Sequence, residues 1–402
     1  MTNKLKSLLN DSVWSISGLI LMNAAAQLLV YPIWDRLFGA DKYGEIVYLL
    51  SLMNIVSITL GSAANYTRIT LSAKKTTLNT PYLAIMTVSS AVTLVFSAAV
   101  CLLNQSCFTT ADTVFYILLC CLTMWRYYAD IEYRLRLNYK GYFIYCLLIG
   151  TGYAVGIPLM YATGIWALAL LPGELLGLAF VIIKGSVLHI DSPVRDSDMP
   201  EILRLFVTLC GSYFISHLIF NGDRILLNHA IGSSAVSIYY IASLFGKTMS
   251  LITTPFNSVI SGYLARYKGG LSVQLMNILA AACVVVSAAA AGLCTLGSEL
   301  ILPFLYPDSY PDARDSVFIC SLSQTIYFSS NIISVILLRF SGTRHQLLLN
   351  AVYAFAFFAV CIPLTIFCGI NGFYIGLLIT SSLRLLYGLC TGYGSALRKN
   401  HT

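Results

Sequence analysis

The sequence predicts an all-α integral membrane protein with about 12 transmembrane helices. Three observations lead to this class: 58% of the 402 residues are hydrophobic, only 10% are charged, and the mean hydropathy is +0.78. Soluble proteins carry roughly 25% charged residues, so most of this surface must face lipid. The apolar runs are too long for barrel strands, and a bilayer core offers no water to unpaired backbone groups, so each run is expected to be a helix.

Twelve apolar segments follow one another along the chain, most of them near the ~20 residues that a bilayer requires. Their order predicts two six-helix lobes, residues 1–188 and 202–402. A charged, proline-containing cytoplasmic linker at 189–201 separates the lobes. The segments are residues 13–34, 44–63, 81–103, 111–125, 142–161, 165–183, 205–221, 233–252 (continuing to 263), 273–296, 317–338, 347–368 and 373–392.

The basic residues are distributed unevenly between the two sides of the membrane. With a cytoplasmic N-terminus, 18 of the 24 lie on that side and two lie inside segments, which leaves four on the opposite side. This is the positive-inside pattern, and twelve spans then place both termini in the cytoplasm. The net charge of +7 therefore follows from topology and requires no nucleic-acid partner. The four opposite residues are Arg36, Lys42, Arg224 and Arg314.

A weak internal repeat relates the two halves. Asp35-Arg36 ends the first segment, and Asp223-Arg224 ends the seventh. Gly39 and Gly232 also occupy matching places. They lie 232 − 39 = 193 residues apart, whereas the two Asp-Arg pairs lie 223 − 35 = 188 residues apart, so the match requires a gap of five residues. Both halves begin on the same side of the membrane, which predicts a parallel pseudo-repeat about an axis along the membrane normal.

The sequence carries no recognisable catalytic or metal-binding pattern. It has no nucleotide-binding loop, GxSxG or HExxH motif, its five histidines are scattered, and the outside loops are too short for a catalytic domain. Eleven of the 12 cysteines lie in or at the ends of apolar segments without CxxC spacing, as small buried hydrophobes do. We therefore predict no enzyme activity, no catalytic residue, no metal and no cofactor.

Three amides lie within the first two segments. Asn23 and Gln27 are four residues apart, so on an α-helix they share one face, and Asn54 lies near the middle of the second segment. Amides at membrane depth need partners, so they are expected to point into the protein. Two interpretations stay open: hydrogen bonds to a polar substrate, or hydrogen bonds between helices.

Charged residues inside the segments are the strongest candidates for function, because each costs about 2.5 to 3.5 kcal/mol at the centre of a helix. Lys247 either lines a central cavity or forms a structural ion pair. Arg384 pairs with a carboxylate or with backbone carbonyls, or it faces the cavity. Glu174 is a structural partner, a proton site or a substrate ligand.

Arg36 and Arg224 border the lipid beside an acid. They either bind substrate or neutralise Asp35 and Asp223. Because four of the five charges in or beside lipid are cationic, a cavity built from them would favour an anion. One such contact is worth about 4 kcal/mol at 4 Å and an effective dielectric near 20, before desolvation.

Three stretches resemble the polysaccharide transporter branch of the multidrug/oligosaccharidyl-lipid/polysaccharide exporter (MOP) superfamily, the O-antigen and capsule type flippases. The stretch from Arg36 to Gly44 resembles the family pattern between helices one and two. Residues 239–242, with Lys247 and Pro255, resemble its helix eight, and residues 306–313 resemble the loop before helix ten. The likeness covers essentially the whole chain in segment order. Pro307 departs from it, because the family more often has Gly there.

The resemblance implies that the two six-helix lobes enclose a central cavity. It also implies a flippase in the bacterial inner membrane that works by alternating access. Its substrate would be a polyprenyl-diphosphate-linked oligosaccharide for O-antigen or other surface polysaccharide assembly, with Arg36, Arg224 and Lys247 contacting the diphosphate or acidic sugars. The implied partners are this lipid-linked oligosaccharide, the membrane lipids and the polysaccharide polymerase machinery. Coupling to an ion gradient is a further expectation, and the sequence does not name the ion.

Two other classes of protein stay open as alternatives to a flippase. A drug exporter of the same superfamily would suit cationic compounds better with an acidic or hydrophobic cavity, whereas these charges are mostly basic. A membrane-embedded glycan polymerase or ligase would be expected to have a large outside loop with Arg or His, which the segment spacing does not provide.

Overall fold

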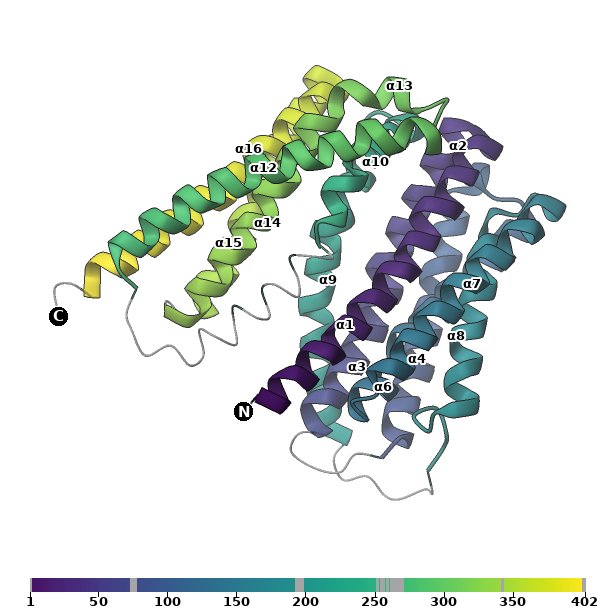
Figure 1. The fold of residues 1–402 in the computed structure, drawn as a ribbon. Helices are drawn as coiled ribbons and strands as arrows, with labels where there is room; N and C mark the ends of the chain where they lie inside the picture. Colours follow the sequence, from purple (N-terminus) through teal and green to yellow (C-terminus); the bar gives the residue numbers. More distant parts are fainter. Residues whose placement is uncertain are drawn as a thin grey trace. The chain divides into compact units, whose positions relative to one another are not determined.

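The structure is a computed structural model that describes residues 2–72, 78–191, 199–250, 271–340 and 343–399, with the single positions 253, 257 and 260. Its contacts divide the chain into two compact units, Met1–Ile225 and Leu226–Thr402. All regular secondary structure in the described ranges is helical (Figure 1). The predicted all-α fold is therefore confirmed.

The first unit is a bundle of helices in which α7 packs against α1 and α8, while α5 packs against α3, α4 and α8. Figure 1 shows α1, α3, α4, α7 and α8 running alongside one another. Its elements are α1 (Thr2–Ala24), a π-helical segment (Ala25–Val30), α2 (Tyr31–Met53), a second π-helical segment (Asn54–Ile58), α3 (Thr59–Ser72), α4 (Thr80–Leu103), a 3₁₀ turn (Gln105–Cys107), α5 (Thr110–Ala129), α6 (Ile131–Leu135), α7 (Tyr139–Thr163), a 3₁₀ turn (Trp166–Ala169), α8 (Leu171–Lys184) and most of α9 (Met199–Ala230).

The second unit is organised around α14, which packs against α10, α12, α15 and α16. Position 255, where the sequence places a proline kink, lies outside the described residues. The elements are α10 (Ser233–Thr248), α12 (Val273–Leu305), α13 (Tyr310–Ala313), a 3₁₀ turn (Arg314–Ser316), α14 (Val317–Phe340), α15 (Thr343–Ala356), a π-helical segment (Phe357–Cys361) and α16 (Ile362–Lys399).

The predicted segments correspond to these helices. Eight helices of the described chain are long and apolar enough to cross a membrane. Two of these candidates, Asp11–Ser72 and Leu348–Leu397, each contain two predicted segments, because the chain breaks helical geometry at Gly39 and Gly369. The remaining two segments, 165–183 and 233–252, correspond to a 3₁₀ turn followed by α8, and to α10.

Glycines with positive φ mark equivalent junctions in the two units. Gly39 (φ 79°) follows the first segment and Gly232 (φ 126°) follows the seventh. Gly164 (φ 73°) follows the fifth segment and Gly369 (φ 61°) follows the eleventh. Residues that carry a Cβ rarely adopt a positive φ, so glycine is the residue that allows the chain to turn there. The recurrence of the same residue at the same junctions agrees with the predicted repeat.

Local capping explains where several helices begin. The Thr109 hydroxyl accepts from the Asp112 amide at 3.1 Å, and the Asp112 carboxylate accepts from the Thr109 amide at 3.2 Å, which forms a capping box before α5. Asn138 caps α7 and Ser272 caps α12 through single side-chain bonds. These caps lie in the polar turns that the sequence places between apolar segments.

The predicted division at 189–201 differs from the division given by the contacts, which falls between Ile225 and Leu226 inside α9. Residues 192–198 of that linker lie outside the described residues. The boundary at 189–201 therefore stays a prediction.

Candidate functional site

Arg224 is a nearly buried cation on α9. Its side chain belongs to the first unit, and the residue is only 8% exposed. The guanidinium Nη1 donates to the Ser51 hydroxyl on α2 at 3.2 Å, while the Arg224 backbone amide donates to the Asp223 carboxylate at 2.8 Å. Tyr31 also lies within electrostatic range of Arg224. The structure thus places Arg224 among polar groups of the first two predicted segments.

The two Asp-Arg pairs that the sequence treats as equivalent differ in burial. Asp35 is buried on α2, whereas Arg36 is exposed. In the second pair, Asp223 and Arg224 are both buried. Consecutive residues on a helix point about 100° apart, so packing decides which member of a pair turns inward. Of the two arginines, Arg224 is the one in a position to act inside the protein.

The three predicted amides are all half-buried. Asn23 donates to the Leu19 carbonyl of its own helix at 2.8 Å. Gln27 lies in the π-helical segment Ala25–Val30, and Asn54 begins the π-helical segment Asn54–Ile58. The one-face argument for Asn23 and Gln27 assumed α-helical spacing, which the π segment changes.

These π segments are a feature that the sequence analysis missed. Such segments are rare, and they occur frequently at functional sites because an extra residue re-aims the side chains and loosens the hydrogen-bond ladder. Two of the three π segments in the described chain contain an amide that the sequence singles out, Gln27 or Asn54.

Lys247 is a nearly buried cation of the second unit, in the last turn of α10 and 9% exposed. Its ammonium lies 5.1 Å from the ring centroid of Tyr239, which is a cation–π geometry. The Tyr239 hydroxyl accepts from the Gln324 amide of α14 at 3.4 Å. An aromatic face of this kind stabilises a buried ammonium.

Glu174 forms a buried ion pair with Arg126. Nε of Arg126 on α5 lies 2.5 Å from a carboxylate oxygen of Glu174 on α8, and the two side chains are 11% and 3% exposed. Tyr153 on α7 donates to the other carboxylate oxygen at 2.7 Å. The sequence analysis ended its fourth segment at position 125 and so left Arg126 outside the span, but this side chain is largely buried and turns inward. This geometry favours the interpretation of Glu174 as a structural partner.

Arg384 is held in a cage of neutral groups. Its guanidinium donates to the Tyr327 carbonyl at 3.2 Å, to the Ser330 hydroxyl at 2.5 Å and to the Asn350 side-chain carbonyl at 3.0 Å. It also stacks over the rings of Tyr327 at 4.3 Å and Tyr353 at 5.6 Å. These contacts tie α16 to α14 and α15, which favours the interpretation that Arg384 pairs within its own half of the chain.

A second network that the sequence analysis missed joins α3, α4, α5 and the segment after α8. Arg68 is buried, donates to the Tyr128 hydroxyl at 2.8 Å and also bonds to Asn79. The Asn79 amide in turn donates to the carbonyls of Ser186 and His189, both at 2.9 Å. This network fixes one end of the first unit and engages both terminal nitrogens of the Arg68 guanidinium.

The described residues contain no group of three or more His, Cys, Asp or Glu side chains placed to hold a metal ion. The 12 cysteines are free thiols in the structure, and seven of them are buried, whereas Cys368 and Cys390 are exposed.

These observations define a multi-pass, all-α membrane protein with buried charges in both units. No family model matches the sequence, and no curated protein is detectably similar to it in sequence.

Solved structures nevertheless share the fold. The lipid II flippase MurJ, in an inward closed conformation, matches with a TM-score of 0.72 at 13% identity over 96% of this chain and 90% of that chain. An inward-facing multidrug resistance MATE family transporter of the MOP superfamily matches with a TM-score of 0.69 at 14% identity, over 95% of this chain and 96% of that one. The Vibrio cholerae MATE transporter VcmN, in the bent form, matches with a TM-score of 0.62 at 13% identity, over 98% and 97%.

The chain therefore shares the fold of these transporters. The proteins it resembles include both a flippase and drug exporters. The polysaccharide transporter branch stays a prediction.

Proposed function

We propose that this protein is a flippase for a polyprenyl-diphosphate-linked oligosaccharide. It moves the sugar-bearing head from the cytoplasmic to the outer leaflet of a bacterial inner membrane by alternating access, and it supplies O-antigen or another surface polysaccharide. The likeness in fold to a protein named as a lipid II flippase supports a lipid-linked substrate. Both termini lie in the cytoplasm, and the polysaccharide polymerase machinery and the membrane lipids are its partners.

The observation that carries this proposal is the presence of two nearly buried cations, Arg224 and Lys247, one in each unit. Arg126 is matched by Glu174, and Arg384 is held by neutral groups, so these two charges belong to the packing of their own units. Among their contacts, Arg224 donates to the Ser51 hydroxyl and Lys247 lies over the ring of Tyr239. A diphosphate in a partly desolvated site would gain about 4 kcal/mol from one such cation at 4 Å.

The remaining predicted ligands take secondary roles in this proposal. Gln27 and Asn54 lie in or at the start of π segments and would bond to sugar hydroxyls, with Asn23 beside them. Arg36 is exposed and would meet the substrate at the mouth of its path. Coupling to an ion gradient is part of the proposal, with the ion left open.

A drug exporter is the second candidate, because two of the matching structures are MATE transporters. An exporter of cationic compounds would be expected to present acidic or apolar groups where this chain has Arg224 and Lys247. Asp35 and Asp223 are buried acids that could serve such a function.

Deletion of the gene in its own host separates the two candidates. The flippase proposal predicts that repeat units accumulate on their lipid at the cytoplasmic face and that surface glycan falls. Normal surface glycan together with hypersensitivity to cationic drugs would favour the exporter instead.

Complementation of the deletion with single variants tests the two cations. Lys247→Glu and Arg224→Ala are expected to lower surface glycan at least tenfold, which corresponds to ~1.4 kcal/mol. Lys184→Ala and Arg204→Ala are matched controls, because both residues are exposed and Arg204 lies on the same helix as Arg224. Unchanged glycan at normal protein abundance would remove the substituted residue from the site.

A further inference from the structure

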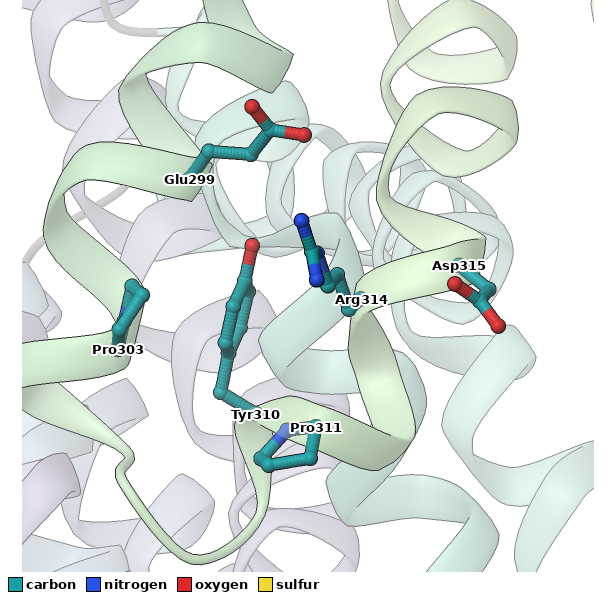
Figure 2. A pocket seen from close by; sticks show the side chains of 6 residues that line it. All are labelled: Glu299, Pro303, Tyr310, Pro311, Arg314 and Asp315. Atoms are coloured by element: carbon teal, nitrogen blue, oxygen red, sulfur yellow. The ribbon is translucent and has the colours of Figure 1, made fainter.

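A pocket at the end of α12 in the second unit has no role in the proposed transport path. It has a volume of about 410 Å³ and lies between the last turns of α12, the short helix α13 and the 3₁₀ turn that follows it (Figure 2). Its lining residues are Glu299, Pro303, Tyr310, Pro311, Arg314 and Asp315.

The centre of this pocket is a buried tyrosine hydroxyl between two opposite charges. Tyr310 is only 6% exposed, and its hydroxyl has no hydrogen-bond partner in the described structure. Figure 2 shows that hydroxyl pointing toward the space between the Glu299 carboxylate and the Arg314 guanidinium. Both charges lie within electrostatic range of it. A buried hydroxyl without a partner costs about 1–3 kcal/mol, which a ligand would recover.

The charges of the pocket specify the chemistry of its ligand. Glu299 and Asp315 accept hydrogen bonds from a cation, while Arg314 donates to an anion. Within the described residues the Glu299 and Arg314 side chains form no ion pair or hydrogen bond with each other, and both are exposed to an incoming group. A ligand that carries both a phosphate and a primary ammonium would satisfy Arg314, Tyr310 and Glu299 together.

The surface beside the pocket is apolar. Leu296, Leu300 and Phe304 follow one another at four-residue spacing on α12 and are 59%, 70% and 77% exposed. Eight residues of helix rise about 12 Å, so this stripe could accompany much of an acyl chain. On α12, Glu299 and Pro303 line the pocket, and each is followed directly by a residue of the stripe, at positions 300 and 304.

We propose that this pocket binds the headgroup of a zwitterionic aminophospholipid, with an acyl chain along Leu296, Leu300 and Phe304. The phosphate bonds to Arg314 and to the Tyr310 hydroxyl, and the primary ammonium donates to Glu299. A choline headgroup has no N–H group that could donate to Glu299. An anionic glycerol headgroup would be repelled by the two carboxylates, Glu299 and Asp315, and attracted by only one arginine. The site therefore selects phosphatidylethanolamine over both.

Native mass spectrometry of the purified full chain, titrated with palmitoyl-oleoyl phosphatidylethanolamine, phosphatidylcholine or phosphatidylglycerol, tests this proposal. The wild type should bind the ethanolamine lipid about tenfold more tightly than either competitor, the factor for one charge-assisted hydrogen bond. Glu299→Gln should bring the ethanolamine and choline lipids to equal affinity. Arg314→Gln and Tyr310→Phe should weaken both of them.

Asp312→Asn is the matched control, because Asp312 is an exposed carboxylate of α13 that does not line the pocket. It should leave the ethanolamine preference intact. The same preference for the ethanolamine lipid over the choline lipid in wild type and Glu299→Gln, measured on variants with unchanged melting temperature, would overturn the proposal that this pocket binds the headgroup. Displacement of the lipid by an equal concentration of sn-glycero-3-phosphoethanolamine would show that no acyl chain is bound, and it would overturn the assignment to a lipid.

Discussion

Replacement of Glu174 by Ala would leave the Arg126 guanidinium charged and deprived of its carboxylate inside the first unit. The two groups lie 2.5 Å apart and their side chains are almost fully buried. Tyr153 would also lose the oxygen to which it donates. The arginine cannot shed its proton, because its ordinary pKa lies above 12.

The size of the effect follows from this geometry. Removal of one member of a buried pair destabilises a protein by about 3–5 kcal/mol, because the desolvated partner is left uncompensated. For a folded unit of roughly 150–250 residues, each kcal/mol lowers the melting temperature by about 2–4 °C, so a fall of about 6–20 °C is expected. Removal of the whole polar cluster, in the triple variant Arg126→Met, Glu174→Leu, Tyr153→Phe, should restore most of this loss.

Thermal unfolding of the purified protein in detergent measures these shifts. Glu45→Ala is the control, because Glu45 forms a partly exposed pair with Lys42 at 3.0 Å, and such pairs contribute at most about 1 kcal/mol. A Glu174→Ala protein as stable as the wild type would refute the reasoning. So would a triple variant no more stable than the single one.

Two further predictions concern packing and Arg384. Gly152→Ala would place a Cβ 2.6 Å from the Gly173 amide nitrogen where α7 crosses α8. The variant should therefore destabilise the protein by at least about 1–3 kcal/mol in the same melting assay. Gly211→Ala is the control and should not lower the melting temperature, because open space surrounds Gly211. Arg384→Lys replaces the planar guanidinium, which donates to three acceptors, with a single ammonium. The free energy of unfolding should therefore fall by about 2–3 kcal/mol, while transport per folded molecule stays constant.

Each of these two predictions has a clear contrary result. Equal melting temperatures for Gly152→Ala and wild type would mean that the two helices do not approach as closely as described. Lost transport in a fully stable Arg384→Lys protein would make that arginine a substrate ligand rather than a structural one.

The helical segments and their junctions were predictable because they follow from composition over long windows. Twenty consecutive apolar residues specify a span whatever their neighbours are. The turn at Gly39 was marked by the polar residues around it, and the structure confirms a break in helical geometry there. Short helices were harder, since α8 has 14 residues and continues a 3₁₀ turn.

The positions of the charges were not predictable in the same way, because the face that a side chain occupies depends on tertiary packing. The sequence analysis ended its fourth segment at position 125, one residue before Arg126, whereas α5 continues to Ala129. That small error in a helix boundary moved a buried arginine to the membrane interface. The buried Glu174 was the available signal, because a buried acid needs a base nearby.

Reconstitution into liposomes tests the central claim most directly. The protein is incorporated with a polyprenyl-diphosphate-linked oligosaccharide, and a membrane-impermeant glycosidase reports which sugars reach the outer face. We predict that the wild type and Lys184→Ala move the lipid faster than protein-free liposomes, and that Lys247→Glu does not. Wild-type liposomes that export a cationic dye but leave the lipid-linked sugar on its original side would contradict the account.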